Sequence, residues 1–336
     1  MKPVICVPMG DPAGVGPEIV AASITDTAIV DKAVVVVTGD REILEKAAAA
    51  MNVSPRMNPI SGKGETLRQE VEEGALNLVQ VETPGLSPFA YGKVQASCGQ
   101  ASYNYIKAGV ALAEAAAVDA LATTPINKES LKAAGVPFIG HTEILGSLTN
   151  SHDPLTMFQV FDLRVFFLTR HLSLLEACKA VRKERVIDYV RRCTASLKQL
   201  GIANPSMVIA GLNPHSGEHG LFGNEEDAEI VPAIEALKAE GFAVFGPNPA
   251  DSVFHFALKG GWDAVLSLYH DQGHIATKMV DFERTIALTL GLPFLRTSVD
   301  HGTAFDIAGK GVVSPVSMVE AIRLAALYAE NIKAAS

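Results

Sequence analysis

The stretch VICVPMGDPAGVGPE, residues 4–18, predicts the fold class of this chain. Val4 to Pro8 form an apolar run of strand type, the glycines that follow indicate a tight turn, and a helical pattern begins at Ile19. A strand, a glycine-rich turn and a helix place backbone N–H groups where an anion can bind. The glycine spacing differs from the dinucleotide fingerprint, however, and Asp11 and Glu18 argue against a simple phosphate cradle. A tight strand-to-helix connection without a ligand explains the same residues.

Strands alternate with helices along the rest of the chain. Such alternation predicts right-handed βαβ units and an α/β fold with a doubly wound, largely parallel sheet. The 336 residues, 48% of them hydrophobic, are enough for a large core and suggest about two domains. Residues 52–96, rich in Pro, Gly and polar side chains, predict loops with one short strand near 78–81. Further strands are predicted at 33–38, 119–122, 157–161, 164–169, 206–210, 243–245 and 264–268, and helices at 41–51 after the N-cap Asp40, 97–117, 174–200, 225–240 and 316–334.

The composition argues against several classes of protein. The formal net charge is −9 and no basic run is present, so nucleic acid is not an expected partner. No apolar run reaches the ~20 residues of a membrane span, and the first residues lack the apolar region of a signal peptide. The four cysteines are widely spaced and form no CxxC motif, which favours the reducing cytoplasm. We therefore expect a cytoplasmic protein that binds neither nucleic acid nor membrane, and that holds any anionic ligand with local Lys, Arg and helix N-termini.

Three histidines follow predicted apolar strands. His171, His215 and His270 each come within a few residues of a strand end, and ligands of open α/β sheets collect outside the carboxyl ends of the strands. Three imidazoles there suit a divalent metal with positions left for substrate. Their long spacing matches no compact metal motif, and each histidine taken alone is better explained as a hydrogen-bonded or surface residue. His274, four residues after His270, is the strongest competing ligand.

Residues 296–311, RTSVDHGTAFDIAGKG, follow an apolar run at 290–295 that predicts a buried strand end. They place two aspartates, a histidine and three glycines in a predicted loop, which are residue types that a ligand site needs. A glycine-rich surface loop without a ligand is the alternative. The cations Lys128, Lys278 and Arg296 could hold phosphate or carboxylate, although a lone lysine is usually an exposed surface charge.

Six segments follow one another in the chain: GDPAGVGPE at 10–18, PINK at 125–128, GHTE at 140–143, NPHSGE at 213–218, YHDQGH at 269–274, and residues 296–311. Together they resemble the 4-hydroxythreonine-4-phosphate dehydrogenase family of the isocitrate/isopropylmalate dehydrogenase-like superfamily, over essentially the whole chain. The resemblance implies two α/β/α domains with a cleft between them. Residues 1–125 and 288–336 would form the first domain with the cofactor loop, and residues 126–287 the second, with the metal and dimer contacts.

The resemblance also implies roles for individual residues of this sequence. A divalent metal (zinc, cobalt, magnesium or manganese) would be bound by His171, His215 and His270. The substrate, a phosphorylated small-molecule hydroxy acid, would contact His141, Thr142, Lys278 and Arg296, with Asp251 contributed across a homodimer that shares its active sites. NAD or NADP would be held at Gly10 and Asp11 and at the loop residues His301, Gly302, Thr303 and Asp306. Lys128, Asp271 or a water would take the proton.

The implied reaction oxidises a secondary alcohol β to a carboxylate, passes hydride to the nicotinamide, and yields a β-keto acid that loses CO2. The vitamin B6 biosynthetic enzymes carry an Asn that contacts the substrate nine residues before the arginine, and in this chain that position is Ala287. The lost amide leaves 4-phospho-D-threonate, 4-phospho-D-erythronate and aromatic cis-dihydrodiol carboxylates open as substrates. Two hypotheses of other classes are a phosphate-binding or acyl-transfer protein without redox chemistry, and a dimeric interaction protein.

Overall fold

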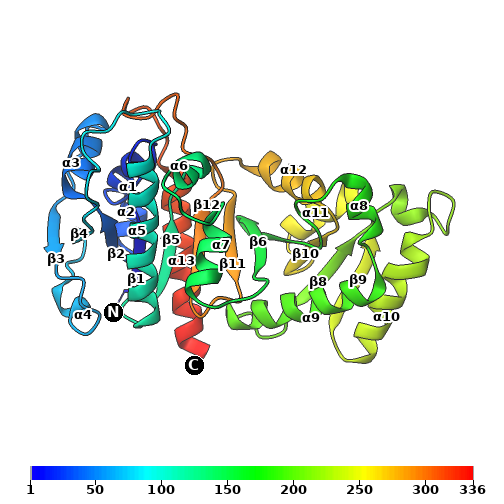
Figure 1. The fold of residues 1–336 in the computed structure, drawn as a ribbon. Helices are drawn as coiled ribbons and strands as arrows, with labels where there is room; N and C mark the ends of the chain where they lie inside the picture. The colour runs from blue at the N-terminus through cyan, green and yellow to red at the C-terminus, as the bar shows by residue number, and fades with distance from the viewer. Residues whose placement is uncertain (1, 336) are drawn as a thin grey trace. The chain divides into compact units, whose positions relative to one another are not determined.

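The computed structural model describes residues 2–335 of the chain. They divide into two compact units: the first holds the chain up to Pro154 together with Ile286–Lys333, and the second holds Leu155–Thr285. Each unit is an α/β structure with its own run of parallel strands (Figure 1).

The first boundary between the units falls at residue 154 and not at residue 125, where the sequence had suggested it. Packing explains the difference. The helices α6 (Lys128–Ala133) and α7 (His141–Leu148) bury apolar side chains in the core of the first unit, so the 126–154 segment belongs to that unit. Those side chains are Leu131, Ile144 and Leu145.

The sheet of the first unit has the order β3-β4-β2-β1-β5-β12-β11. Its neighbouring strands are parallel, except for the antiparallel pair β11–β12. The strands are β1 (Val4–Pro8), β2 (Val34–Gly39), β3 (Met57–Ile60), β4 (Leu76–Gln80), β5 (Ala120–Thr123), β11 (Ile286–Leu290) and β12 (Leu295–Val299). The other helices of this unit are α1 (Gly16–Ser23), α2 (Thr27–Val30), α3 (Arg41–Ala50), α4 (Leu67–Glu70), α5 (Ala96–Glu114) and α13 (Val316–Ala335).

The central strand β1 is buried on both faces, which explains its continuous apolar sequence. Val4 and Cys6 share a hydrophobic core with Ile106 and Val110 of α5, so α5 covers one face of the sheet (Figure 1). Because successive side chains of a strand alternate between faces, Ile5 points to the opposite face. The strand at 4–8 and the N-cap Asp40, whose Oδ1 accepts from the Ile43 N–H at 3.2 Å, confirm the sequence predictions.

Two elements inside residues 52–96 were not predicted. They are β3 and α4, each of four residues. Elements this short carry too few residues for a hydrophobic period to show. Pro59 within β3 is tolerated because β3 is the edge strand of the sheet, where a missing N–H leaves no ladder hydrogen bond unmade.

The prediction of one strand end at 290–295 was wrong, because these residues turn the chain between β11 and β12. Gly291, at φ +91°, opens the turn with a backbone conformation that L side chains rarely adopt. The consequence is functional: Arg296 lies inside a strand and not in the loop that the sequence suggested.

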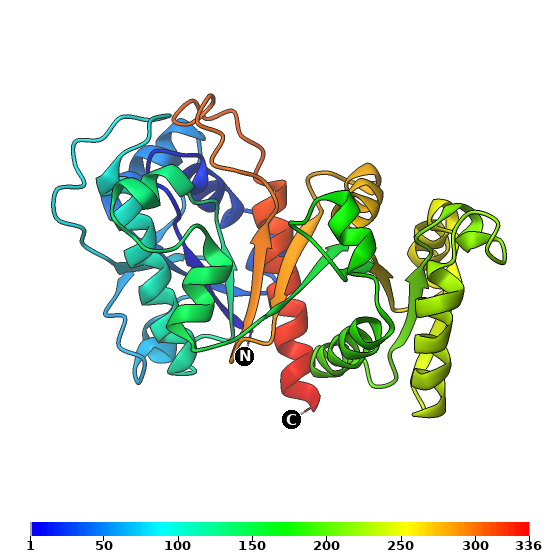
Figure 2. The same ribbon diagram turned by 45° about the vertical axis from the view of Figure 1, so that its right-hand side comes forward.

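The second unit has the strand order β6-β7-β10-β8-β9. β6 and β7 form an antiparallel pair, and β7, β10, β8 and β9 are parallel to one another. The strands are β6 (Leu155–Val160), β7 (Leu163–Phe167), β8 (Ser206–Ala210), β9 (Ala243–Asn248) and β10 (Ala264–Ser267). The helices are α8 (Leu174–Lys179), α9 (Lys183–Gln199), α10 (Val231–Ala239), α11 (Ala250–Leu258) and α12 (His270–Val280), seen from a second direction in Figure 2.

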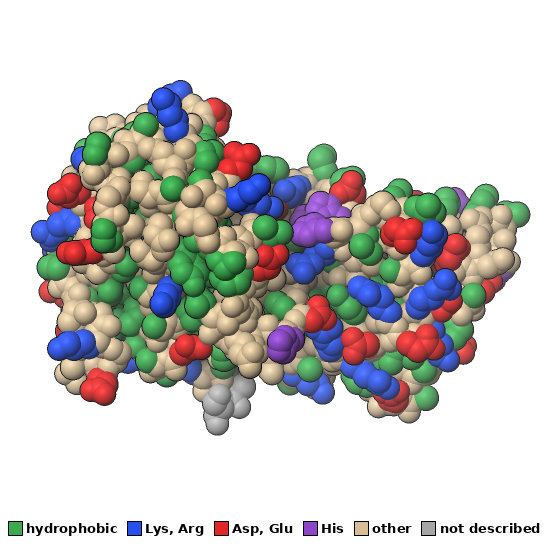
Figure 3. Space-filling view, viewed as in Figure 1, with side chains coloured by type: hydrophobic (Ala, Val, Ile, Leu, Met, Phe, Trp, Pro, Cys, Tyr) green, Lys and Arg blue, Asp and Glu red, His purple; other side chains and the backbone are tan. Residues whose placement is uncertain are grey.

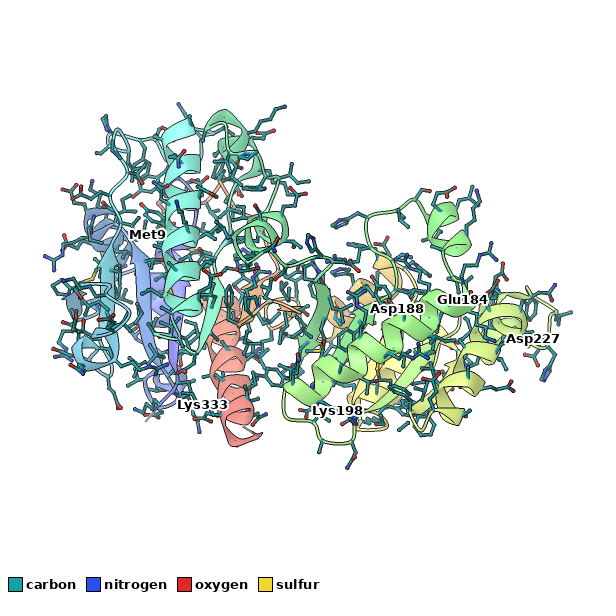
Figure 4. The ribbon with its side chains drawn as sticks, turned by 60° about the horizontal axis from the view of Figure 1, so that its bottom comes forward. Met9, Glu184, Asp188, Lys198, Asp227 and Lys333 are labelled. Atoms are coloured by element: carbon teal, nitrogen blue, oxygen red, sulfur yellow. The ribbon has the colours of Figure 1, made fainter. Side chains whose placement is uncertain are left out.

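The helix predicted at 174–200 is two helices, α8 and α9, separated at Ala180–Arg182. The charged side of α9 is solvated: Glu184, Asp188 and Lys198 are exposed (Figure 4), while Val186 and Val190 are buried. All four cysteines carry free thiols. Residues 2–335 include no helix with the length and apolarity that crossing a membrane demands.

Candidate functional site

Arg296 is a buried cation that no carboxylate in the described chain neutralises. Only 5% of its surface is exposed. Its Nε and Nη2 donate to Thr123 Oγ1 at 3.0 and 2.6 Å, and its Nη1 donates to Thr289 Oγ1 at 2.8 Å. A guanidinium has five N–H donors, so two stay available to a ligand. Burial lowers the pKa of Arg296 to about 9, and an anion beside it would offset the cost of burying the charge.

His141, the first residue of α7, adds a second polar group near this arginine. Its ring Nε2 is buried and has no hydrogen-bond partner within residues 2–335. Burial, and after it the positive charge of Arg296, holds the pKa of His141 well below its ordinary value. The imidazole is therefore neutral and able to serve a ligand as donor or acceptor. We call Arg296, His141, Thr123 and Thr289 the anion site; Thr142 follows His141 and is partly buried.

Ala287 borders the anion site. Across β11 and β12, Ala287 pairs with Ser298 and Thr289 pairs with Arg296. Paired residues, and residues two apart in one strand, share a face of the sheet. Ala287 is thus a diagonal neighbour of Arg296 on the same face, so the size and polarity of side chain 287 affect the space beside the guanidinium.

The glycine-rich turn after β1 is closely packed against neighbouring backbone and side chains. A Cβ on Gly10, at φ +81°, would lie 2.3 Å from Thr124 Oγ1 and one on Gly14 would lie 2.8 Å from Thr303 Cβ. Asp11 is fully buried, and its Oδ1 accepts from the Ala13 N–H at 2.9 Å. Gly10 and Asp11 are both buried, and the cofactor contact expected of them stays a prediction. The Asp11 carboxylate stabilises the turn through its hydrogen bond with the Ala13 N–H. The Thr303 carbonyl accepts a hydrogen bond from the Val15 N–H at 3.0 Å.

Burial raises the pKa of Asp11 to about 6, against the weaker opposing effects of the Ala13 N–H and the Ser130 hydroxyl. Asp11 Oδ2 and Ser130 Oγ are both buried and make no hydrogen bond of ordinary geometry with the described residues. The charge of Asp11 is therefore only partly compensated by its neighbours.

The segment 301–311 wraps the start of α1. His301 Nε2 lies 2.8 Å from Ser317 Oγ in the first turn of α13, and the Gly309 and Gly311 N–H groups both donate to the Glu18 carboxylate. Thr303 is buried, whereas Gly302 and Asp306 are exposed. A ligand-binding role for this segment stays a prediction from the sequence, and the contacts with Glu18 were not predicted.

Three of the histidines in the second unit follow neighbouring parallel strands. His171 comes after β7, His270 begins α12 after β10, and His215 comes after β8; the order β7-β10-β8 puts all three at the same edge of the sheet. The His171 and His270 ring centroids lie 6.2 Å apart, and histidines gather visibly on the surface in Figure 3. Among residues 2–335, no three or more His, Cys, Asp or Glu side chains form a group arranged to hold a metal.

His274 is part of this cluster. Its ring centroid lies 4.1 Å from that of His270, and its buried Nδ1 has no hydrogen-bond partner in the described chain. Burial, followed by the charge of His270, lowers the pKa of His274 to about 4. The spacing of four residues on one helix was the signal for this contact. A neutral imidazole with an unpaired, buried ring nitrogen, as in His274, is of the ligand type that divalent metals accept.

His215 lies in a strained loop. Six consecutive residues, 215–220, have positive φ, including His215 at 52° and His219 at 53°, a conformation that costs non-glycine residues about 1–2 kcal/mol each. Glu226, almost fully buried, holds the loop's entry: its Oε1 accepts from the Leu212 and Asn213 N–H groups, both at 2.7 Å. Such strain persists at functional sites where the surroundings enforce it.

The remaining predicted residues are more exposed. Asp271 is 73% exposed and its Oδ1 lies 2.6 Å from His270 Nδ1. Lys278 of α12 places its ammonium 5.1 Å from the Phe282 ring centroid, and Asp251 lies exposed in the first turn of α11. Lys128, at the start of α6, is exposed. An open pocket beside His171 and His270 is also lined by Arg170, Leu174, Tyr269 and Asp271.

Comparisons with known proteins show the family of this chain. A relative from Fusobacterium nucleatum, 60% identical over 333 residues and covering 99% of both chains, bears the name "Putative D-threonate 4-phosphate dehydrogenase". A relative of the same name from Halalkalibacterium halodurans is 56% identical and covers 98% of both chains. The solved 4-hydroxythreonine-4-phosphate dehydrogenase of Klebsiella pneumoniae is 37% identical, with a TM-score of 0.88 and 98% of both chains covered. The family described as "Pyridoxal phosphate biosynthetic protein PdxA" matches residues 31–325, and this chain belongs to that family.

Proposed function

We propose that this member of the PdxA family is an NAD(P)-dependent dehydrogenase of a 4-phosphorylated hydroxy acid, with D-threonate 4-phosphate as its first candidate substrate. The observation that carries the proposal is Arg296, a buried guanidinium with two unused N–H donors beside a neutral His141. Such a pair is suited to a carboxylate or phosphate, because a planar guanidinium binds these groups through parallel N–H bonds.

The proposed reaction is an oxidation followed by a decarboxylation, and the nicotinamide of the cofactor is the oxidant. The C3–H bond of the substrate breaks and its hydride goes to the nicotinamide ring of NAD or NADP, while the C3 hydroxyl proton goes to a base. The product is a β-keto acid, and breaking its C1–C2 bond releases CO2 and leaves a three-carbon ketone phosphate after protonation. Lys128 and Asp271 are the candidate bases, both exposed enough to exchange the proton with water.

Two considerations support D-threonate 4-phosphate as the substrate. The relatives at 54–60% identity carry D-threonate 4-phosphate in their names, whereas the solved structures at 37–40% carry 4-hydroxythreonine-4-phosphate. Ala287, next to Arg296 on the sheet face, offers no amide to a substrate amino group. D-threonate 4-phosphate has a hydroxyl in place of that amino group, so it needs no such partner.

We propose that His171, His215 and His270 hold a divalent metal, with His274 as a fourth candidate ligand. When bound, such an ion polarises the hydroxyl that is oxidised and the ketone that forms. The protein's own contribution is to orient the imidazoles: Asp271 Oδ1 lies 2.6 Å from His270 Nδ1, which leaves Nε2 of that ring for other partners. NAD and NADP are equally compatible with the loop 301–309.

The proposal includes a homodimer in the cytoplasm, with Asp251 reaching the partner's site. Helices of the second unit expose large apolar side chains, among them Leu175 of α8 (65%) and Ile275 and Met279 of α12 (63% and 80%). Ile275 and Met279 are four residues apart and share one helix face. Apolar side chains concentrated in this way favour a protein interface, and four free thiols fit a reducing compartment.

A substrate panel tests the proposal. D-threonate 4-phosphate, D-erythronate 4-phosphate and 4-hydroxythreonine-4-phosphate are each incubated with the full chain, NAD or NADP, and Zn²⁺, Co²⁺, Mg²⁺ or Mn²⁺. Reduction of the cofactor with one of them supports it. If calorimetry detects binding of the phosphorylated acids but no NAD(P) binding and no reduction, the competing function is correct: an anion-binding or acyl-transfer protein without redox activity.

A further inference from the structure

Glu18 is a buried carboxylate whose partners are backbone groups of a distant loop. It is 2% exposed and occupies the third position of α1. Its Oε2 accepts from the Gly309 N–H at 2.8 Å and its Oε1 from the Gly311 N–H at 2.7 Å. Hydrogen bonds to a carboxylate are stronger than neutral ones, and the N-terminal end of a helix stabilises the negative charge.

The loop that donates these bonds has a backbone conformation that depends on two glycines. Gly309 and Gly311 have φ of +78° and +65°. A Cβ on Gly309 would lie 2.8 Å from the Tyr91 ring, and one on Gly311 would lie 2.0 Å from the Ala50 carbonyl oxygen at the end of α3. Both glycines are therefore required by backbone conformation and by close approach.

The loop is also fixed at its first residues. The Thr303 carbonyl accepts from the Val15 N–H at 3.0 Å, one turn before Glu18 in the chain. Thr303 and both glycines are thus attached to the same short segment, residues 15–18, and residues 304–308 span the distance between these attachments. Without the Glu18 bonds, two buried or half-buried N–H groups would have to find other acceptors.

We infer that Glu18 is the positioning residue of the loop 303–311, and that its two oxygens set the affinity of this loop for the adenosine part of NAD(P). The inference rests on the proposed function, which assigns the loop to the cofactor. Glu18 itself is buried and bonded to the backbone of the loop, so we expect it to act on the cofactor only through the loop. Its removal loosens the loop and weakens cofactor binding, but leaves the anion site intact, because none of its contacts involves Arg296 or His141.

Three full-length variants test this role. Glu18→Ala removes both acceptors. Glu18→Gln keeps the shape and one acceptor oxygen but turns an NH2 group toward the other N–H. The control is Glu70→Gln, which alters another carboxylate that holds a loop backbone, through the Ser61 N–H at 2.6 Å, at an exposed position of the same unit. We measure amide hydrogen exchange of residues 303–311 and the Kd of NADH and of phosphorylated acid for each protein.

We expect the exchange rate of residues 303–311 and the Kd of NADH to be highest in Glu18→Ala, intermediate in Glu18→Gln and lowest in wild type. Exchange in 303–311 is roughly tenfold or more faster in Glu18→Ala, and the Kd of NADH rises by roughly tenfold or more, as the loss of a hydrogen bond to a charged group predicts. Glu18→Gln lies between it and wild type. The Kd of the phosphorylated acid stays within about twofold, and Glu70→Gln binds NADH as wild type does.

Two results would overturn the inference. Unchanged exchange in 303–311 would show that Glu18 does not position the loop. Faster exchange with an unchanged NADH Kd would show that the loop does not set cofactor affinity. A wild-type protein that binds no NADH would instead overturn the proposed function, and the exchange data would still report whether Glu18 holds the loop. If Glu18→Ala does not fold, Glu18→Gln provides the same comparison.

Discussion

The guanidinium of Arg296 donates twice to the hydroxyl of Thr123, from Nε at 3.0 Å and from Nη2 at 2.6 Å, and the positive charge meets no acidic side chain in residues 2–335. A charge buried in this way destabilises the folded protein until an anion arrives. The buried charge of Arg296 therefore makes the stability of the first unit depend on whether an anionic ligand is bound.

Replacing Arg296 by a neutral side chain of similar length should stabilise the ligand-free protein. At neutral pH the guanidinium is protonated in both the folded and unfolded states, so its burial cost is present in full. Arg296→Met removes that cost and should raise the free energy of unfolding by about 1–3 kcal/mol, less any cost of freeing the threonine hydroxyls. Urea unfolding at neutral pH measures the change, and a loss of stability of similar size would contradict it.

Asp11→Asn should remove a pH dependence of stability. The pKa of Asp11 is raised to about 6 in the folded state by burial, so the folded protein prefers the protonated form. Between about pH 4 and pH 6 the unfolded state holds fewer protons, and wild-type stability falls as the pH rises. Asn keeps the acceptor for the Ala13 N–H and should make the protein more stable above pH 6, by roughly 2–3 kcal/mol. Parallel stability profiles of the two proteins would refute this assignment.

Gly311→Ala and Gly85→Ala form a matched pair that isolates close packing. Both glycines have positive φ, +65° and +76°, but a Cβ at 311 meets the Ala50 carbonyl at 2.0 Å, whereas one at 85 meets nothing within 4 Å. We expect Gly85→Ala to cost about 1 kcal/mol of stability and Gly311→Ala about 3 kcal/mol or more. Thermal or urea unfolding measures the loss of stability in each variant. Equal losses would show that the loop backbone shifts at residue 311 to make room for the added Cβ.

Ala287→Asn should change substrate preference. Asn at this position places an amide diagonal to Arg296, where it can bond to an amino group on C2 of the substrate. We expect kcat/KM for 4-hydroxythreonine-4-phosphate relative to D-threonate 4-phosphate to rise by roughly tenfold or more, the effect of one hydrogen bond made and one polar mismatch introduced. Ala287→Leu, which fills the space without an amide, is the control; an equal shift in both variants would mean that size and not polarity decides.

His215→Ala should weaken binding of a divalent metal without unfolding the protein. The His215 side chain follows β8 in a loop that Glu226 anchors through backbone N–H groups, so its loss leaves that anchor in place. Titration calorimetry with Zn²⁺ or Mn²⁺ should show at least a roughly tenfold rise in Kd, since changes to residues that only orient the ligands already cost about 10–100-fold. His152→Ala, at a position outside the proposed ligand set, should bind as wild type. Unchanged affinity in His215→Ala would remove this residue from the set.

The sequence predicted most of the fold because its strands are apolar runs flanked by turn residues. Val4–Pro8 and Ser206–Ala210 match the observed strands at both ends. The turn at 291–294 was missed because Leu290, Leu292 and Leu295 continue the apolar run across it, although Gly291 and Pro293 are both turn residues. Helices α6 and α7 were assigned to the wrong unit because helix position does not reveal which core receives the buried side chains.

The sequence predicted which residue types form the candidate site, but it predicted few of the contacts between them. The positions of His171, His215 and His270 after strands followed from hydrophobic pattern, and their common edge followed from parallel topology. Arg296 was found as a cation, but its burial depended on the β11–β12 hairpin. Glu18 was interpreted from the sequence as a negative charge that argues against phosphate binding. In the structure its carboxylate accepts hydrogen bonds from the N–H groups of residues 309 and 311, far along the chain. Contacts of that separation leave no local pattern.

The most direct test of the account is cofactor reduction by wild type and Arg296→Met with D-threonate 4-phosphate, NAD or NADP and a divalent metal. The account predicts reduction of the cofactor by wild type, with kcat/KM at least roughly a hundredfold lower in Arg296→Met, because a buried charged contact to the substrate is lost. NADH binding should be alike in both proteins. Equal turnover by the two proteins, or no reduction by wild type with any of the three phosphorylated acids, would contradict it.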